Sequence, residues 1–215
     1  LGWSCQVPFE SGLQDTVEWL ARDFAGNDYD LRRTIRGLVL SDAYSRDSQW
    51  PEGERPSPIY FAVARPRPLT PNQYGSALVF AAADPEQLAK PKTPEDLAKR
   101  LADLEKRGEN LAKRFDRPDD TFQVSVDEAL YFSNSDQVQN DLLGEGSKLL
   151  GRVLKTEGLA KRLEVAFLNT LSREPSPEET ETLNGYLEAR SADEKGAWQQ
   201  VLWALMTSSE MRFNR

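Results

Sequence analysis

The stretch SPEETETLNGYLEARSADEKGAWQQVLWALMTSSEMRFNR, residues 176–215, decides the fold class. It holds two helix-start signatures, Ser-Pro-Glu-Glu at 176–179 and Ser-Ala-Asp-Glu at 191–194. In such a capping box the Ser hydroxyl accepts a hydrogen bond from the N–H of the Glu three residues on, and the Glu carboxylate accepts one from the N–H of the Ser. Apolar residues then return every three or four positions, which is the spacing of a helix with one buried face. The stretch predicts two amphipathic helices that pack antiparallel, with buried positions at Leu183, Tyr186 and Leu187 on the first and at Trp198, Val201, Leu202 and Leu205 on the second.

The same signals extend towards the N-terminus. Thr70 precedes Pro71 and Gln73, and Ser125 precedes Glu128, so both sites combine a cap residue with a side chain that can return the bond. Periodicity and breaks predict further helices over about 11–25, 31–41, 71–84, 94–115, 126–134, 137–143, 148–154 and 159–171. Each apolar stripe is expected to face inward, including Leu13, Val17, Leu20, Ala21 and Phe24, then Leu31, Ile35, Leu38 and Val39, then Ala129, Leu130 and Phe132, and finally Leu163, Ala166, Phe167, Leu168 and Leu171.

The helix over 93–115 has a different pattern. Its apolar residues alternate four- and three-residue steps with an interruption at Gly108, and they are Leu97, Leu101, Leu104, Leu111 and Phe115. A 3.5-residue period flanked by Lys and Glu is typical of a narrow coiled-coil seam. The helix either packs on a neighbouring helix of the same chain or pairs with another chain. We favour packing within the chain, because three heptads are short for a stable coiled coil.

The periodicity disappears between about 45 and 58, where Pro51, Gly53, Pro56 and Pro58 predict a Pro-rich loop. Residues 60–64 have no obvious pairing partner and are expected not to form a strand. Arg65-Pro66-Arg67-Pro68, with Trp50 and Tyr60 nearby, is the most site-like surface feature. Two guanidiniums held apart by prolines can bind carboxylates or stack on aromatic rings. The alternative, which we favour, is that these arginines anchor the loop to acidic helix ends.

Together these elements predict an all-α fold, an irregular multi-helix bundle with a Pro-rich loop and a short heptad-patterned helix. A chain of 215 residues is long enough to bury a core without disulfides or metals. We expect a single helical domain over 1–215, with possible sub-bundles at 1–90 and 121–215 joined by the helix at 93–115.

Composition narrows the range of functions. The net charge of −8 disfavours nucleic acid and an anionic membrane surface, because both need clustered Lys and Arg. No run of about eighteen apolar residues occurs, so membrane insertion is not expected. The chain has no histidine and one cysteine, Cys5. This composition excludes catalytic Ser-His and Cys-His dyads and the common metal sites built from His and Cys ligands. Cys5 itself is expected to be a partly buried apolar side chain.

Paired carboxylates are the remaining route to acid–base chemistry. The adjacent pairs are Asp119-Asp120, Glu178-Glu179 and Asp193-Glu194. The last two fall in first turns of helices, where carboxylates complement the positive end of the helix dipole. No Gly-x-Ser-x-Gly elbow, Walker loop or dinucleotide glycine pattern occurs. We therefore predict no catalytic, cofactor-binding or metal-binding residues, and we favour a chain that is not an enzyme; Met206 and Met211 are expected to be core or surface residues rather than haem ligands.

Five segments resemble a known family. They include the runs NDYDLRR at 27–33, RPRPLTPNQ at 65–73, ALYFSNS at 129–135 and LSREPSPEE at 171–179, and the last is LWALMTSSEMRFN at 202–214. On these segments the chain resembles the C-terminal domain of unknown function 1553 of large planctomycete-type bacterial proteins, which lies downstream of a cytochrome-c-associated domain. The chain departs from the pattern at Tyr74-Gly75-Ser76-Ala77, where family members tend to carry a basic-acidic pair. The stretch between Pro85 and Asp120 is shortened or remodelled.

The resemblance implies a context rather than an activity. The family has no established catalytic residues, and its association with c-type cytochrome modules implies an exported, periplasmic or cell-envelope location. Because the first residue is Leu1, we expect the chain to be a piece of a longer protein. We predict a non-catalytic helical interaction or scaffold module of a larger exported protein, with adjacent cytochrome-c-associated domains or another protein as its partner. The alternatives are a carboxylate-dependent hydrolase acting on polysaccharide and a redox-partner docking module whose acidic surface meets a basic cytochrome face.

Overall fold

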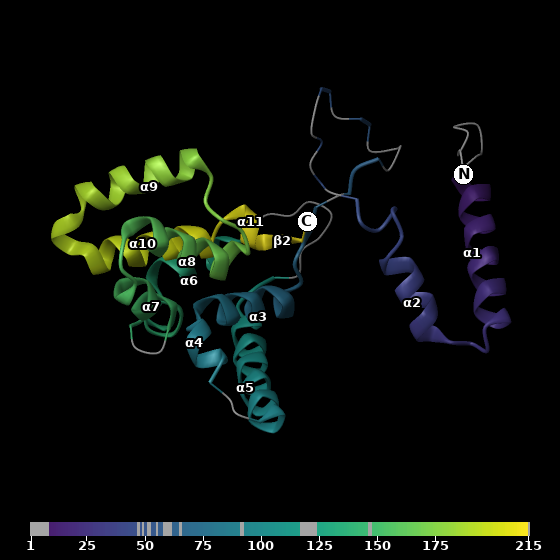
Figure 1. Cartoon of the computed structure of the whole chain (residues 1–215), viewed down its shortest axis with the longest axis horizontal. Coiled ribbons are helices and arrows are strands. Elements are labelled where there is room, and N and C mark those ends of the chain that lie inside the picture. The colour runs from purple at the N-terminus through teal and green to yellow at the C-terminus, as the bar shows by residue number, and fades with distance from the viewer. Residues whose placement is uncertain are drawn as a thin grey trace. The chain divides into compact units, whose positions relative to one another are not determined.

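The computed structural model describes residues 9–46, 48, 50, 53–54, 56–57, 62–64, 66–90, 93–116, 124–145 and 148–214, and it confirms the all-α fold. The chain divides into two compact units, residues 1–65 with 215 and residues 66–214. Figure 1 shows the helices of both units, which we describe separately. That the whole chain acts as a single domain stays a prediction.

The first unit contains a helical hairpin formed by α1 (Phe9–Gly26) and α2 (Leu31–Val39). The guanidinium of Arg33 on α2 binds the carboxylate of Asp23 on α1. The rings of Phe24 and Tyr29 meet edge to face with centroids 5.4 Å apart. Both contacts lie close to the turn, so the two helices are held together at that end of the hairpin.

The prediction that the hairpin turns its apolar stripes inward is wrong for much of both helices. The side chains that remain 45–60% exposed are Leu13, Val17, Leu31, Ile35, Leu38 and Val39. The reason is geometric, because the contacts between α1 and α2 lie near the turn and leave the rest of each stripe uncovered. Two helices without a third layer cannot bury a full apolar face on each.

The second unit is an irregular bundle with a very small antiparallel ribbon. Its elements are β1 (Arg67–Pro68), α3 (Pro71–Ala82), α4 (Pro85–Leu88), α5 (Pro94–Ala112), α6 (Val126–Asn134), the π-helical turn η2 (Val138–Leu142), α7 (Leu149–Lys155), α8 (Leu159–Leu171), α9 (Pro177–Ala189), the 3-10 turn η3 (Ser191–Asp193), α10 (Glu194–Met206), α11 (Ser209–Arg212) and β2 (Phe213–Asn214). The helices predicted over this region are all present, and the short α4, α11 and η3 were not predicted.

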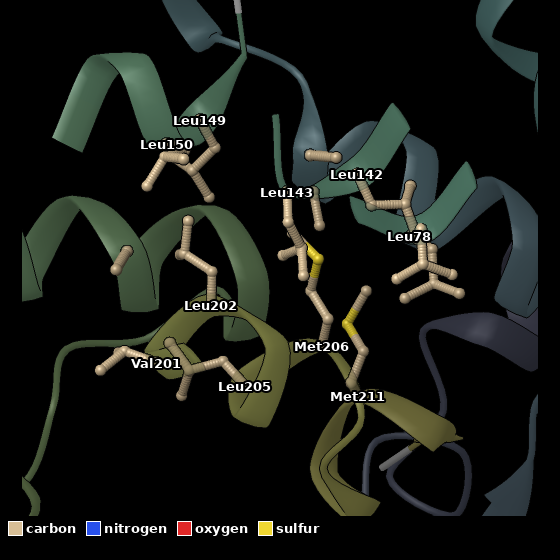
Figure 2. Close-up of a cluster of buried hydrophobic side chains, with 14 of the residues drawn as sticks. Leu78, Leu142, Leu143, Leu149, Leu150, Val201, Leu202, Leu205, Met206 and Met211 are labelled. Atoms are coloured by element: carbon tan, nitrogen blue, oxygen red, sulfur yellow. The ribbon is translucent and has the colours of Figure 1, made fainter. Parts of the chain in front are cut away.

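The core of this unit lies between α3, α7, α8 and α10. Figure 2 shows Leu202 of α10 pointing toward Leu149 and Leu150 of α7, with Leu143 and Met206 drawn between this group and Leu78 of α3. Trp198 and Phe167 are each 1% exposed. Burying one such side chain contributes about 1.5–3 kcal/mol, so this cluster is the main source of the unit's stability. The predicted buried positions on α10 are confirmed, and Met206 and Met211 both belong to the core. The prediction that Leu168 of α8 is buried is wrong, because its side chain is 44% exposed.

The predicted capping boxes have two outcomes. Thr70 with Gln73 and Ser176 with Glu179 form complete boxes, as predicted. The box at 191–194 is wrong, because Asp193 caps α10 by accepting a hydrogen bond from the N–H of Gly196 at 3.0 Å. A carboxylate is a good acceptor at this position, so the α-helix begins later and residues 191–193 form a 3-10 turn instead.

Helix α6 buries a different face from the one predicted. Ser125 accepts from the N–H of Glu128 at 3.2 Å, but the Glu128 carboxylate turns inward instead of returning the bond. Glu128 and Phe132 are 3% and 5% exposed, whereas Leu130 is 53% exposed and Ala129 is also exposed. Residues four apart share a helix face, so the buried pair places Leu130 on the outer side.

Helix α5 packs along α3 of the same chain, which agrees with the packing that we favoured from the sequence. Leu104, Gly108 and Leu111 are buried in this contact. Leu97 and Leu101, at the start of the heptad pattern, are 39% and 36% exposed. Figure 1 shows the N-terminal end of α5 extending away from the rest of the unit, which is why the seam is only partly covered.

The ribbon joins the two ends of the second unit. Arg67 pairs with Asn214, and Pro68 pairs with Phe213, in antiparallel register. The N–H of Leu69 donates to the carbonyl oxygen of Arg212 at 2.9 Å. We predicted no strand here, because two residues are too few to produce an alternating pattern.

Candidate functional site

A cleft of about 360 Å³ lies in the second unit between α6 and the C-terminal segment. Its lining includes four aromatic residues, which are Tyr74, Phe132, Trp203 and Phe213. Glu128 of α6 and Arg212 of α11 also line it. A concave apolar site with a few polar groups is the usual form of a ligand pocket, so this cleft is the first place to look for chemistry.

Glu128 and Arg212 form a buried ion pair in the cleft. The Nη1 atom of Arg212 lies 2.8 Å from Oε1 of Glu128, and Nη2 donates to Oε2 at 3.0 Å. The two side chains are only 7% and 4% exposed. The guanidinium carbon of Arg212 also lies 4.0 Å from the ring centroid of Tyr74, whose hydroxyl donates to the carbonyl oxygen of Met206 at 3.1 Å. The pair therefore ties α6, α3 and the C-terminal segment together.

Burial changes the acidity of two of these groups. Removal from water raises the pKa of Glu128, and the nearby Arg212 charge acts in the opposite direction without cancelling it. Burial likewise raises the pKa of Tyr74 to about 12. A raised carboxyl pKa is a feature of general acids, but it also occurs in structural ion pairs.

The described residues of the cleft do not supply the other groups that a hydrolase needs. Glycoside hydrolysis uses two carboxylates, and Glu128 is the single carboxylate among the lining residues, where it is bound to Arg212. The hydroxyls of Thr207 and Ser208 donate to helix carbonyls, each at 2.8 Å. The arrangement stabilises the packing of α6 on the C-terminal segment.

The carboxylate pairs singled out in the sequence hold helix ends. Glu179 accepts from the N–H of Ser176 at 2.7 Å and from Nη2 of Arg173 at 2.7 Å. Arg173 also donates through Nε to Glu210 at 2.8 Å, so it joins the start of α9 to α11. Hydrogen bonding to Arg173 lowers the pKa of Glu179 to about 2. The predicted structural role of the pair at 178–179 is therefore supported.

Asp193 and Glu194 have the same kind of role, since Asp193 caps α10 and Glu194 binds Arg162 of α8. Asp119-Asp120 lies outside the described residues, as does Cys5. In the Arg65–Pro68 motif Arg65 is outside them too, and so is Tyr60. Residues 62–64 form no strand, as expected. Arg67 is exposed and belongs to β1, where its backbone pairs with that of Asn214.

Two kinds of site are missing from the part of the chain that the structure describes. No three His, Cys, Asp or Glu side chains there are grouped to hold a metal ion. Searched over the same residues, no helix combines the length and the apolar character needed to cross a membrane. The predicted absence of metal and cofactor sites remains a prediction for the whole chain.

The first unit offers an exposed apolar surface. We call the exposed residues Leu13, Val17, Leu31, Ile35, Leu38 and Val39 the hairpin surface. Helix α2, which carries most of it, has three arginines and no carboxylate in the sequence LRRTIRGLV. The exposed apolar residues of α2 recur at helical spacing, and an exposed apolar patch on a folded protein marks a site of interaction. The hairpin surface is therefore the candidate functional site that the described residues support best.

Comparison with known protein families assigns the chain. The sequence profile of PSD1, a family described as a protein of unknown function (DUF1553), matches residues 12–187. The chain belongs to the PSD1 family. The match covers most of the hairpin and the second unit as far as Leu187 in α9, and it includes four of the five segments on which the resemblance was based. The fifth, at 202–214, lies beyond the matched range. No curated protein and no solved structure matches this PSD1 chain.

Proposed function

We propose that this PSD1-family chain is a non-catalytic helical interaction module of a larger exported bacterial protein, and that it docks through the hairpin surface onto a neighbouring cytochrome-c-associated domain. The observation that carries the proposal is the exposure of six large apolar side chains, between 45% and 60%, on two consecutive helices. Covering such a surface with a partner is favourable by about 25 cal/mol for each Å² of apolar area removed from water.

The contrast between the two units supports a docking role. The second unit has a hydrophobic core of its own, in which Trp198 and Phe167 are almost fully buried. In the second unit, the cleft beside α6 is lined by one carboxylate, Glu128, which is already bound to Arg212. The second unit is thus suited to a stable scaffold, and the first unit is suited to contact with a partner.

Binding of the neighbouring domain tests the proposal. The cytochrome-c-associated domain of the natural polypeptide is immobilised, and retention of the full chain is compared with that of Ile35→Asp and of Leu168→Asp. Leu168 is the matched control, because it is a leucine of α8 with 44% exposure in the second unit. We expect Ile35→Asp to weaken binding by at least about tenfold, because a buried unpaired carboxylate is costly, and Leu168→Asp to bind like the wild type.

Two results would overturn the docking role. One is a wild-type chain that is not retained by the neighbouring domain. The other is an Ile35→Asp variant that folds and is retained as well as the wild type. The exported location is tested separately by cell fractionation, where recovery of the protein from the cytoplasm alone would contradict it.

A further inference from the structure

We propose that the hairpin surface recognises an amphipathic helix that carries Asp or Glu along one flank of its apolar stripe. This inference rests on the proposed docking function and names the chemistry of the partner. The partner helix belongs to the domain that the module contacts, and its apolar and its acidic parts are argued in turn.

The apolar part follows from the spacing of exposed residues on α2. Leu31, Ile35 and Leu38 stand at positions i, i+4 and i+7, so they form one stripe along the helix. All three are at least 45% exposed. A helix that presents its own apolar residues at the same spacing can interdigitate with this stripe, which is the usual geometry of helix recognition by a helical surface.

The acidic part follows from the arginines beside that stripe. Arg32 and Arg36 each follow a stripe residue by one position, so both lie about 100° around the helix from it and on the same flank. Both side chains are exposed. A partner whose carboxylates lie along the facing flank would pair with both arginines, as charged flanking residues do in coiled coils.

Three carboxylates of the hairpin are already bound to other groups. Asp23 binds Arg33, and Glu18 binds Arg22 on the next turn of α1. Asp30 caps α2 by accepting from the N–H of Arg33. These contacts leave the flank of Arg32 and Arg36 as the positive edge of the surface.

A lipid surface fits the hairpin less well than a helix. An anionic membrane needs clustered positive charge, whereas α1 carries Asp15, Glu18 and Asp23 in the same unit. A partner helix is narrow enough to contact the arginine flank of α2 without also contacting the carboxylates of α1. The experiment therefore treats membrane binding as an outcome that overturns the inference.

Two synthetic peptides probe the chemistry directly. Both have about twenty residues and the same Leu and Ala stripe, and they differ only in carrying Glu or Lys at the flanking positions. Fluorescence anisotropy measures their binding to the full chain at about 0.15 M salt, where surface charges are partly screened. We expect the Glu peptide to bind at least about tenfold more tightly than the Lys peptide.

Charge-reversal variants locate the preference on α2. In the double variant Arg32→Glu with Arg36→Glu, the Lys peptide should bind more tightly than the Glu peptide. Lys99→Glu with Lys106→Glu on α5 changes the net charge by the same amount and should leave the order unchanged. Ile35→Asp should weaken the binding of both peptides. The milder Ile35→Gln repeats the test if the aspartate variant fails to fold.

The outcomes separate this inference from the proposed function. If the neighbouring domain binds but the Glu peptide shows no advantage, the inference fails and the docking role stands. If neither the domain nor any peptide binds, both fail. Binding to vesicles of phosphatidylcholine and phosphatidylglycerol without peptide preference would overturn the inference. So would a dimer in solution that Ile35→Asp dissociates, since a second copy would then occupy the surface.

Discussion

Gly75 of α3 and Gly108 of α5 meet backbone to backbone where the two helices pack. A Cβ atom on Gly75 would clash with the carbonyl oxygen of Gly108 and lie 3.0 Å from the nitrogen of Ala112. A Cβ atom on Gly108 would lie 2.6 Å from the Cα of Ser76. Two features that stood apart in the sequence, the unusual run at 74–77 and the interruption of the heptads, are therefore the two sides of one contact.

Substitution of either glycine by alanine should destabilise the second unit. The close approach leaves no room for a methyl group, and overpacking costs about 1–3 kcal/mol, which outweighs the gain of about 1 kcal/mol in helix propensity. Gly185 of α9 is the matched control, because nothing lies within 4 Å of its Cβ position and Gly185→Ala should stabilise the chain. Urea unfolding measures all three variants. Increased stability of Gly75→Ala or Gly108→Ala would show that the helices are farther apart than described here.

Breaking the Glu128–Arg212 pair from one side should cost more than removing both partners. Arg212→Met leaves a buried carboxylate and Glu128→Leu leaves a buried guanidinium, so each is expected to cost about 3–5 kcal/mol. The double variant should cost clearly less than the sum of the two, because neither charge is then left alone. A double-mutant cycle in urea measures the coupling. Simple additivity would mean that the two side chains do not interact in solution.

Stability in acid should depend on Glu179. Its pKa is lowered from 4.5 to about 2 in the folded chain, so its contribution is present above 4.5 and is lost as the pH falls through about 2. The wild type should exceed Glu179→Gln by about 1–2 kcal/mol at neutral pH, after allowance for its partial exposure, and the difference should vanish near pH 2. Urea unfolding between these limits measures it, and a difference that does not change with pH contradicts the role of Arg173.

Glu128 should show the opposite pH dependence. Burial raises its pKa in the folded chain, so its contribution is present below 4.5 and is lost as the pH rises through the raised value. Glu128→Gln should therefore flatten a fall in stability that the wild type shows above pH 4.5. The same unfolding series measures this slope, and an identical slope in both proteins would argue against the burial of Glu128.

The hairpin surface should tolerate polar substitution in the isolated chain. Ile35 is 50% exposed, so Ile35→Gln should change the free energy of unfolding by no more than about 0.5 kcal/mol. Leu149 is fully buried, and Leu149→Ala should cost about 2–5 kcal/mol. Thermal and urea unfolding compare the two. A loss above about 2 kcal/mol for Ile35→Gln would show that the surface is covered in the free chain.

The sequence predicted what depends on local signals. Helix positions in the second unit followed from caps and periodicity, and complete capping boxes formed where Ser or Thr had no competitor, as at Thr70 and Ser176. The box at 191–194 failed because Asp193 is a second cap residue inside the motif. Local patterns alone could not rank the two candidate caps.

Features that depend on contacts between distant residues could not be read from the pattern. Glu128 matched a capping box, and only the fold brings Arg212 within reach of its carboxylate. The one available signal was its position four residues before Phe132, on the same helix face. The exposure of the hairpin surface was not predicted for a related reason. An apolar stripe indicates that a helix face packs against something, but it does not indicate whether the partner is the same chain or another molecule.

Hydrogen–deuterium exchange tests most directly whether the hairpin surface is the docking site. Amide exchange is measured for the full chain alone and after mixing with the neighbouring cytochrome-c-associated domain. We predict that amides of α1 and α2, residues 9–39, exchange at least about tenfold more slowly in the mixture, while those of α8 and α10 are unchanged. Protection confined to α8 and α10, or no new protection anywhere in the chain, would contradict the docking role of the hairpin.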